Sequence, residues 1–216
     1  MSDSGHPGRR GAAMAQDPVT PSRLRELYDR PRGRAVTKEL RQLDRHCRRF
    51  IELSPFVVVA SGAADGHFDA SPRGGEAGFV QVADDRTLLI PDSPGNNRLD
   101  TMDNILSTGR VGLLFLIPGI DETLRVNGGA RLVEHADVLA RFAAMKRPPK
   151  LAIEVTVAQA YLHCAKAFMR SQLWDPARHV PRSALPTTGE MIHDQTGSAD
   201  APESQEAMVE RYKALL

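Results

Sequence analysis

Residues 88–104, LLIPDSPGNNRLDTMDN, contain the junction between a short apolar strand and a helix. We expect the helix over residues 99–107, with Asn97 as its N-cap and Gly109 just after its end. The free N–H groups of the helix entry, its dipole and the guanidinium of Arg98 would then converge on one point. This pattern predicts an anion site suited to a phosphate. An ordinary capped helix with a solvated arginine accounts for the same residues.

On both sides of this junction the chain alternates short apolar runs with turns. Strands are expected at residues 56–61, 68–71, 78–82, 87–90, 111–117, 123–133 and 151–157. Tight turns join most of them and repeated strand–helix units are absent, which favours a small β-barrel over a doubly wound sheet. Gly128 and Gly129, inside one of these strands, indicate a bulge or a close approach to another backbone. The predicted fold class is mainly β with flanking helices.

Helical periodicity and breakers define the remaining organisation of the chain. A short helix capped by Ser22 is expected first, followed by helices over residues 37–53 and 136–145. The predicted division is a disordered tail at residues 1–20, a barrel domain with its N-terminal helices at 21–185, and a polar linker with a C-terminal helix at 186–216. The final helix is expected to begin at Glu203.

Composition excludes several functional classes. The chain has 216 residues and a net charge of +1, and its longest apolar run, residues 111–117, is too short to cross a bilayer. No signal peptide is visible and the two cysteines lie far apart, so a cytoplasmic protein without a membrane partner is expected. Residues 1–50 are basic, with 12 Lys/Arg against 6 Asp/Glu, but they lack the aromatic residues of a nucleic-acid site. Histidines at metal-ligand spacing are absent, so no metal is predicted.

Three further polar clusters accompany the predicted anion site. The first, DASPRG at residues 69–74, presents Ser71 and Arg73 where a strand ends, and suits a second clamp on the same anion or a charged loop. The second, TLRVN at residues 123–127, places Thr123 on a polar strand face that suits either a heterocycle edge or solvent.

The third cluster is HCAKAFMR at residues 163–170, followed by Trp174. If this segment is helical, His163, Lys166 and Arg170 share one face. Such a face beside an indole suits an anionic or flat substrate, and a solvated basic face is the alternative. These three residues are the catalytic candidates, and none is assigned as a proton donor.

Seven ordered motifs resemble the pyridoxamine 5'-phosphate oxidase-like flavoproteins, in particular a subgroup of FMN-dependent enzymes of unknown substrate. They are SPFVVVAS, DASPRG, GFVQV, LLIPDSPGNNRLD, GLLFLIPG, ETLRVNGGA and HCAKAFMRSQLWDP, and the similarity runs from about residue 22 to residue 190. The resemblance implies an FMN-binding split β-barrel that forms a homodimer with two FMN sites at the subunit interface.

Residue by residue, the resemblance implies a set of cofactor contacts. Asn97 and Arg98 would hold the FMN phosphate, Ser71 and Arg73 would line the same end, and Thr123 would meet the isoalloxazine edge. The backbone at Ile90 and Pro91 would flank the ring or the ribityl chain. Residues 163–174, including Lys166 and Trp174, would approach from the partner subunit.

Two departures from the family pattern bear on the substrate. The RxVLLK strand of the oxidases proper is replaced by DASPRG. The C-terminal tryptophan and arginine of those oxidases, which recognise pyridoxal phosphate, have no counterpart in this chain. Vitamin B6 oxidation is therefore not expected. Gly75 stands where an acidic residue is expected, so any contact made by that carboxylate is lost.

The expected function is that of an FMN-dependent oxidoreductase acting on a small molecule, with NAD(P)H as a candidate electron donor. A non-catalytic FMN-binding or flavin-sensing protein is the alternative. Haem degradation and deazaflavin-dependent reduction are further enzyme alternatives.

Overall fold

The computed structural model describes residues 18–213, which belong to two compact units. The unit that ends at Thr37 contains the helices α1 (Pro21–Leu27) and α2 (Arg34–Thr37). The hydroxyl of Thr20 accepts from the N–H of Arg23 at 3.2 Å and caps α1, so the predicted Ser22 cap is wrong. The tail predicted at residues 1–20 lies almost entirely outside the described residues.

The second unit begins at Lys38 and contains every other element. Its first helix, α3 (Arg45–Leu53), starts eight residues later than the helix predicted from residue 37. Two local contacts explain the late start. Leu40 forms an antiparallel bridge with Ala160, and the carboxylate of Asp44 accepts from the N–H groups of His46 and Cys47 at 3.0 and 2.8 Å. A side chain that caps a helix in this way fixes the position of its first turn.

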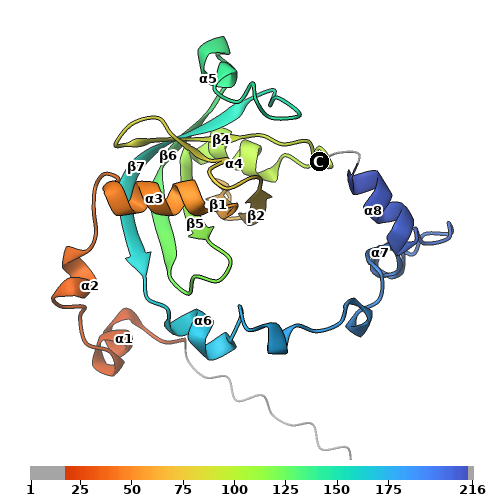
Figure 1. The fold of residues 1–216 in the computed structure, drawn as a ribbon. Coiled ribbons are helices and arrows are strands. Elements are labelled where there is room, and N and C mark those ends of the chain that lie inside the picture. The colour runs from red at the N-terminus through yellow and green to blue at the C-terminus, as the bar shows by residue number, and fades with distance from the viewer. Residues whose placement is uncertain (1–17, 214–216) are drawn as a thin grey trace, which may run out of the picture. The chain divides into compact units, whose positions relative to one another are not determined.

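Seven antiparallel strands form one sheet in the order β2-β1-β5-β6-β7-β4-β3. All of them except β3 are labelled in Figure 1. They are β1 (Phe56–Gly62), β2 (Phe68–Gly74), β3 (Gln81–Val82), β4 (Thr87–Pro91), β5 (Arg110–Leu116), β6 (Thr123–Val133) and β7 (Ala152–His163). Together with the flanking helices, this arrangement confirms the predicted fold class, a mainly β split barrel.

Alternation along the strands builds the core. In β1 the side chains of Val57 and Val59 are fully buried while their neighbours are more exposed, and β5 follows the same rule. Side chains of a strand point alternately to its two faces, so one face of each strand can pack inward. Helix α3 packs against β3, β6 and β7, and α4 (Asp100–Thr108) packs against β1, β2, β5 and β6.

The bulge predicted in β6 is confirmed. The register between β6 and β7 shifts between Asn127 and Gly128. A Cβ atom on Gly128 would lie 2.1 Å from the carbonyl oxygen of Thr156, a distance that no side chain tolerates. The glycine therefore permits the close approach of β7 at this point.

Several predicted boundaries move in the structure. The strand predicted from residue 78 is reduced to β3, because Gly78 adopts φ +82° in a turn before it. The helix predicted over residues 136–145 is shortened to α5 (Ala136–Ala140), and the strand predicted to end at residue 157 continues as β7 to His163.

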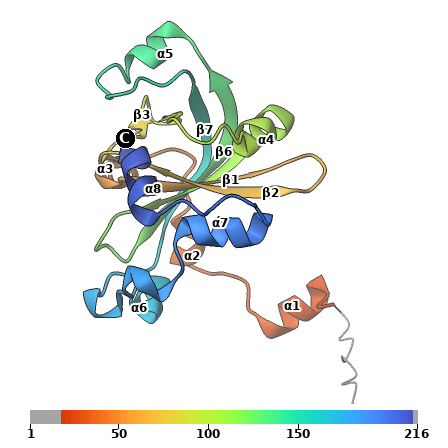
Figure 2. The same cartoon turned by 90° about the vertical axis from the view of Figure 1, so that its right-hand side faces the viewer.

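Between β7 and residue 213 the chain forms only short helices. These are α6 (Lys166–Ser171), two 3-10 turns, α7 (Thr188–Thr196) and α8 (Gln205–Lys213). Helix α7 lies beside α8 (Figure 2) and begins with a capping box made by Thr187 and Glu190. Helix α7 therefore lies within the segment predicted as a polar linker, and a C-terminal helix is confirmed. The predicted domain boundaries stay predictions. Over residues 18–213, the helices are all too short or too polar to cross a membrane.

Candidate functional site

A hydroxyl–carboxylate cluster joins β2 to the first turn of α4. The hydroxyl of Ser71 donates to Asp69 at 2.9 Å, and the hydroxyl of Thr101 donates to the same carboxylate at 2.5 Å. The two hydroxyl oxygens are 3.1 Å apart. Asp69 and Ser71 are two residues apart on one strand, so both side chains point to the same face, which α4 covers.

Arg73 lies one further step along the same face of β2. Its Nη1 donates to Asp92, which follows β4, at 2.9 Å. The side chains of Arg73 and Asp92 are only 18% and 29% exposed. Because β2 and β4 lie toward opposite edges of the sheet, this pair brings the DASPRG segment and the end of β4 to one place.

The loop before α4 carries the next two predicted residues. Asn97 adopts φ +60°, and Leu99, without a side-chain hydrogen bond, occupies the N-cap position. The predicted Asn97 cap is therefore wrong, because an N-cap residue that bonds the first turn has an extended backbone. The predicted end of the helix at Gly109 is confirmed, since Gly109 has φ +64° and closes α4.

Arg98 is exposed beside the start of α4. Its Nε donates to Asp100 at 2.6 Å, and its side chain is 76% exposed. The pKa of Arg98 is raised chiefly by this hydrogen bond to Asp100, with a smaller contribution from Asp69. Arg98 lies three residues before Thr101, which belongs to the Ser71 cluster. The first turn of α4 also contains Asp103, so two carboxylates accompany the predicted anion site.

Ile90 and Pro91 end β4, where they pair with Ile153 and Ala152 of β7. The side chain of Ile90 is fully buried in the main hydrophobic core, so only its backbone is available to a ligand. Pro91 immediately precedes Asp92, which places this predicted pair beside Arg73.

Thr123 and His163 are directly opposite each other on β6 and β7. Thr123 is 5% exposed, and the Nε2 atom of His163 is buried without a hydrogen-bond partner among the described residues. Because His163 ends a strand, the prediction that it shares a helix face with Lys166 and Arg170 is wrong. Those two residues lie on α6, and both are exposed.

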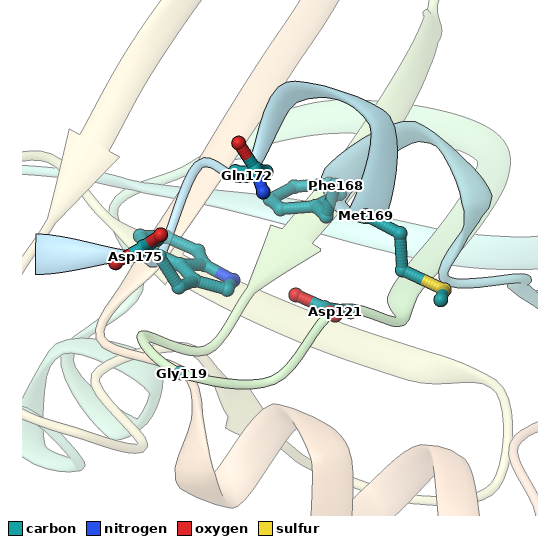
Figure 3. A pocket seen from close by; sticks show the side chains of 7 residues that line it. Gly119, Asp121, Phe168, Met169, Gln172 and Asp175 are labelled. Atoms are coloured by element: carbon teal, nitrogen blue, oxygen red, sulfur yellow. The ribbon is translucent and has the colours of Figure 1, made fainter. Parts of the chain in front are cut away.

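Trp174 lies after α6 and is anchored to the β5–β6 hairpin. Its Nε1 donates to the carbonyl oxygen of Ile120 at 2.9 Å, and its ring stacks on Phe168 with centroids 5.5 Å apart. An open pocket of about 400 Å³ lies beside this pair. Its lining, most of which is labelled in Figure 3, comprises Gly119, Asp121, Phe168, Met169, Gln172, Trp174 and Asp175.

The predicted site residues therefore form two groups. One contains Ser71, Arg73, Ile90, Pro91 and Arg98, with Asn97 in the adjoining loop. The other contains Thr123, His163 and Trp174, with Lys166 and Arg170 on the short helix between the last two.

Two paths through the sheet connect the two groups. Along β7, Ile90 pairs with Ile153 near the beginning of the strand and Thr123 pairs with His163 at its end, about 33 Å of strand apart. Across the sheet the path is shorter, because Arg73 pairs with Val57, Val57 with Phe115, and Phe115 with Leu124, which is three strand spacings or about 14 Å.

Some residues of these groups were missed by sequence reasoning. Thr101 and Asp92 are hydrogen-bond partners of Ser71, Asp69 and Arg73 that come from distant parts of the chain. Their contacts depend on how α4 and β4 meet β2, a property that local sequence patterns do not encode.

Lys38 and Tyr161 were also missed, and Tyr161 lies beside both Arg125 and Lys38. The Nη1 of Arg125 donates to the hydroxyl of Tyr161 at 3.0 Å, and the Nζ of Lys38 lies 5.1 Å from the centroid of the Tyr161 ring. The signal lies in the length of the last strand. If that strand is extended to His163 and paired with residues 123–127, Tyr161 lies opposite Arg125.

Comparison with known families gives one match, described as pyridoxamine 5'-phosphate oxidase and covering residues 43–164. The match contains all the strands of the sheet, and the chain belongs to this family of FMN-binding split-barrel proteins. A search of curated proteins found no match.

Solved structures with a similar fold include three of bacterial origin. HupZ of Group A Streptococcus is 16% identical, with 55% of this chain and 91% of that chain covered and a TM-score of 0.46. An FMN-binding protein of Syntrophomonas wolfei is 11% identical, with 54% and 83% covered and a TM-score of 0.42. The haem storage protein HutZ of Vibrio cholerae is 12% identical, with 56% and 94% covered and a TM-score of 0.42.

Proposed function

We propose that this protein binds FMN non-covalently and acts as an FMN-dependent oxidoreductase on a small molecule. The observation that carries the proposal is the family match over residues 43–164, which contains both groups of predicted site residues up to His163. In this proposal Ser71, Arg73 and Arg98 hold the phosphate end of the cofactor, and Thr123 lies at the edge of the isoalloxazine ring.

The donors and acceptors of the β2–α4 cluster suit FMN. Arg73 and Arg98 each use one N–H group in the hydrogen bonds with Asp92 and Asp100, and a guanidinium has five. Both arginines therefore retain donors for a phosphate. The carboxylate of Asp69 can accept from the hydroxyl groups of a ribityl chain. A ligand with an anionic end and a polyhydroxy chain matches this mixed set of groups.

We also propose the homodimer with FMN sites at the subunit interface that the family resemblance implies. Within one chain, Arg73 of the first group lies three strand spacings, about 14 Å, from Leu124, the neighbour of Thr123, so both groups can belong to one extended ligand site. An apolar side chain on the rim of the sheet, Phe68, is 88% exposed and available to such an interface.

The bound flavin would supply hydride transfer at its N5 atom, with NAD(P)H as the proposed electron donor. The residues of the chain would supply binding and orientation. Arg73 and Arg98 would fix the position of the phosphate, and the rigid β6–β7 pair at Thr123 would fix the ring.

The test is a titration of the purified protein with FMN, followed by addition of NADH or NADPH under nitrogen. We expect a flavin absorption band that remains with the protein after gel filtration, bleaches with the reductant, and returns in air. A protein that does not retain FMN contradicts the proposal. Retained FMN that neither nucleotide reduces would favour the non-catalytic FMN-binding alternative. Sedimentation at several concentrations measures whether FMN-loaded protein is a dimer.

A further inference from the structure

A cationic cluster surrounds Tyr161 at the end of the β6–β7 pair. Arg125 is directly opposite Tyr161 in the register, and Thr123 is opposite His163. The backbone bridge between Leu40 and Ala160 holds the segment of Lys38 against β7. Three segments distant in the sequence therefore meet here, and each is held by backbone hydrogen bonds.

The two cations of this cluster are not balanced by a carboxylate. The Nζ of Lys38 donates to the carbonyl oxygen of Leu162 at 2.7 Å, and the Nη1 of Arg125 donates to the Tyr161 hydroxyl at 3.0 Å. Over residues 18–213, neither side chain has an acidic group within 4.0 Å. Most other arginines that make side-chain hydrogen bonds around the barrel, such as Arg73 and Arg131, pair with a carboxylate. What sets this place apart is that both unpaired cations lie beside one aromatic ring, that of Tyr161.

One buried polar atom of the same cluster lacks a partner in the described part of the chain. The Nε2 atom of His163 is buried without a hydrogen bond, and the centroid of its ring lies 5.0 Å from that of Tyr161. Buried polar groups are almost always satisfied, so the missing partner of His163 is expected from outside the folded chain. The hydrogen bond from Arg125 to the Tyr161 hydroxyl is exposed, so this part of the cluster is open to a ligand.

We propose that Lys38, Arg125 and Tyr161, next to His163, recognise the carboxylate or phosphate group of an anionic substrate. The guanidinium, the ammonium and the phenol each offer a donor to an oxyanion, and the negative charge of that oxyanion would offset the two cations. The role as a substrate site rests on the proposed flavin function, because Thr123, the proposed contact of the flavin ring, is two residues from Arg125 on the same strand face.

The test measures binding of benzoate and of inorganic phosphate to the full-length protein by calorimetry, with and without FMN. We expect one of the two anions to bind, which identifies the group recognised. Arg125→Gln and Lys38→Gln should each weaken that binding at least tenfold, and Tyr161→Phe should weaken it several-fold. Arg110→Gln, which removes an exposed arginine from the start of β5, is the matched control and should leave it unchanged.

Binding of neither anion at millimolar concentration overturns the proposal, as does an equal loss in Arg110→Gln. The substrate role has its own readout, a shift of the flavin absorption band when the anion binds the FMN-loaded protein. Anion binding without this shift overturns the substrate role. A protein that binds the anion but not FMN contradicts the proposed function while the anion site stands. FMN affinity should be the same in Arg125→Gln and in the unchanged protein.

Discussion

Arg73 of β2 and Asp92 after β4 form an ion pair at 2.9 Å, although 19 residues separate them and their strands lie toward opposite edges of the sheet. Both side chains are more than two-thirds buried, so water screens the pair only in part. The pair therefore has a structural role in holding the barrel together, in addition to its place beside the proposed FMN phosphate.

Arg73→Gln should lower the free energy of unfolding by about 1–2 kcal/mol, between the values typical of exposed and of buried pairs. The reason is that Asp92 would keep its charge but lose its partner. Urea unfolding measures the change, and Arg49→Gln, which breaks an exposed pair with Glu52, should cost less than about 0.5 kcal/mol. Equal effects of the two variants would contradict a special contribution from the Arg73–Asp92 pair.

Gly128→Ala should destabilise the protein by about 2–3 kcal/mol, because the new Cβ would lie 2.1 Å from the carbonyl oxygen of Thr156. The neighbouring glycine provides the control. A Cβ on Gly129 would meet its nearest atom at 3.7 Å, an ordinary contact, so Gly129→Ala should change stability little. Thermal unfolding of the two variants measures the difference, and similar midpoints would mean that β7 moves away from the bulge without cost.

The strands were predictable because burial on one face of a sheet leaves a two-residue period in the sequence. Strand β6 has the predicted bounds of Thr123 and Val133, and its bulge coincides with the Gly128-Gly129 pair. Such features depend on the residues themselves and on their nearest neighbours.

The predictions failed where distant contacts decide the structure. The spacing of His163, Lys166 and Arg170 fits a helix, yet His163 pairs with Thr123 forty residues earlier and remains in β7. Leu40 lies outside the observed helix because its backbone forms a bridge with Ala160. In both places the backbone pairing of a strand overrides a local helical pattern.

Asp44 should make stability sensitive to acid through its cap of α3. Burial alone would raise the pKa of this carboxyl, but hydrogen bonds from the N–H groups of Cys47 and His46 lower it overall. Because the pKa of Asp44 is lower in the folded protein than in the unfolded chain, its ionised form stabilises the fold. This contribution is fully present above the unfolded pKa of 3.8 and is lost as the pH falls through the folded pKa. Asp44→Asn should keep the cap at neutral pH but remove this part of the acid dependence, whereas Asp44→Ala should cost about 1 kcal/mol at pH 7.

Unfolding curves between pH 2.5 and pH 7 measure this dependence. The stability difference between the unchanged protein and Asp44→Asn should narrow as the pH falls below about 3.8. A difference that does not change with pH would exclude Asp44 as the titrating cap.

The two cysteines should differ strongly in reactivity toward iodoacetamide. Burial, followed by the hydrogen bond with Asp44, raises the pKa of Cys47 to about 11. Cys164 is exposed, and its pKa is lowered chiefly by the backbone N–H of Lys166. Since the thiolate is the reactive form, one alkylation at Cys164 is expected at pH 7.5, with Cys47 modified only after unfolding. Mass spectrometry identifies the site, and Cys164→Ser should remain unmodified; rapid labelling of Cys47 in the folded protein would contradict its burial.

Arg98→Ala should weaken FMN binding about tenfold to a hundredfold, the range expected when a charge-assisted hydrogen bond to phosphate is lost.

The ion pair between Arg98 and Asp100 allows a second, opposite test. Asp100→Asn removes a negative charge beside the phosphate site and releases the Nε of Arg98, so it should tighten FMN binding several-fold. Quenching of FMN fluorescence measures both affinities, with Arg110→Ala as the control for a general loss of charge. An unchanged affinity in Arg98→Ala would remove this residue from the site, and weaker binding in Asp100→Asn would mean that the carboxylate positions the arginine rather than competing with the phosphate.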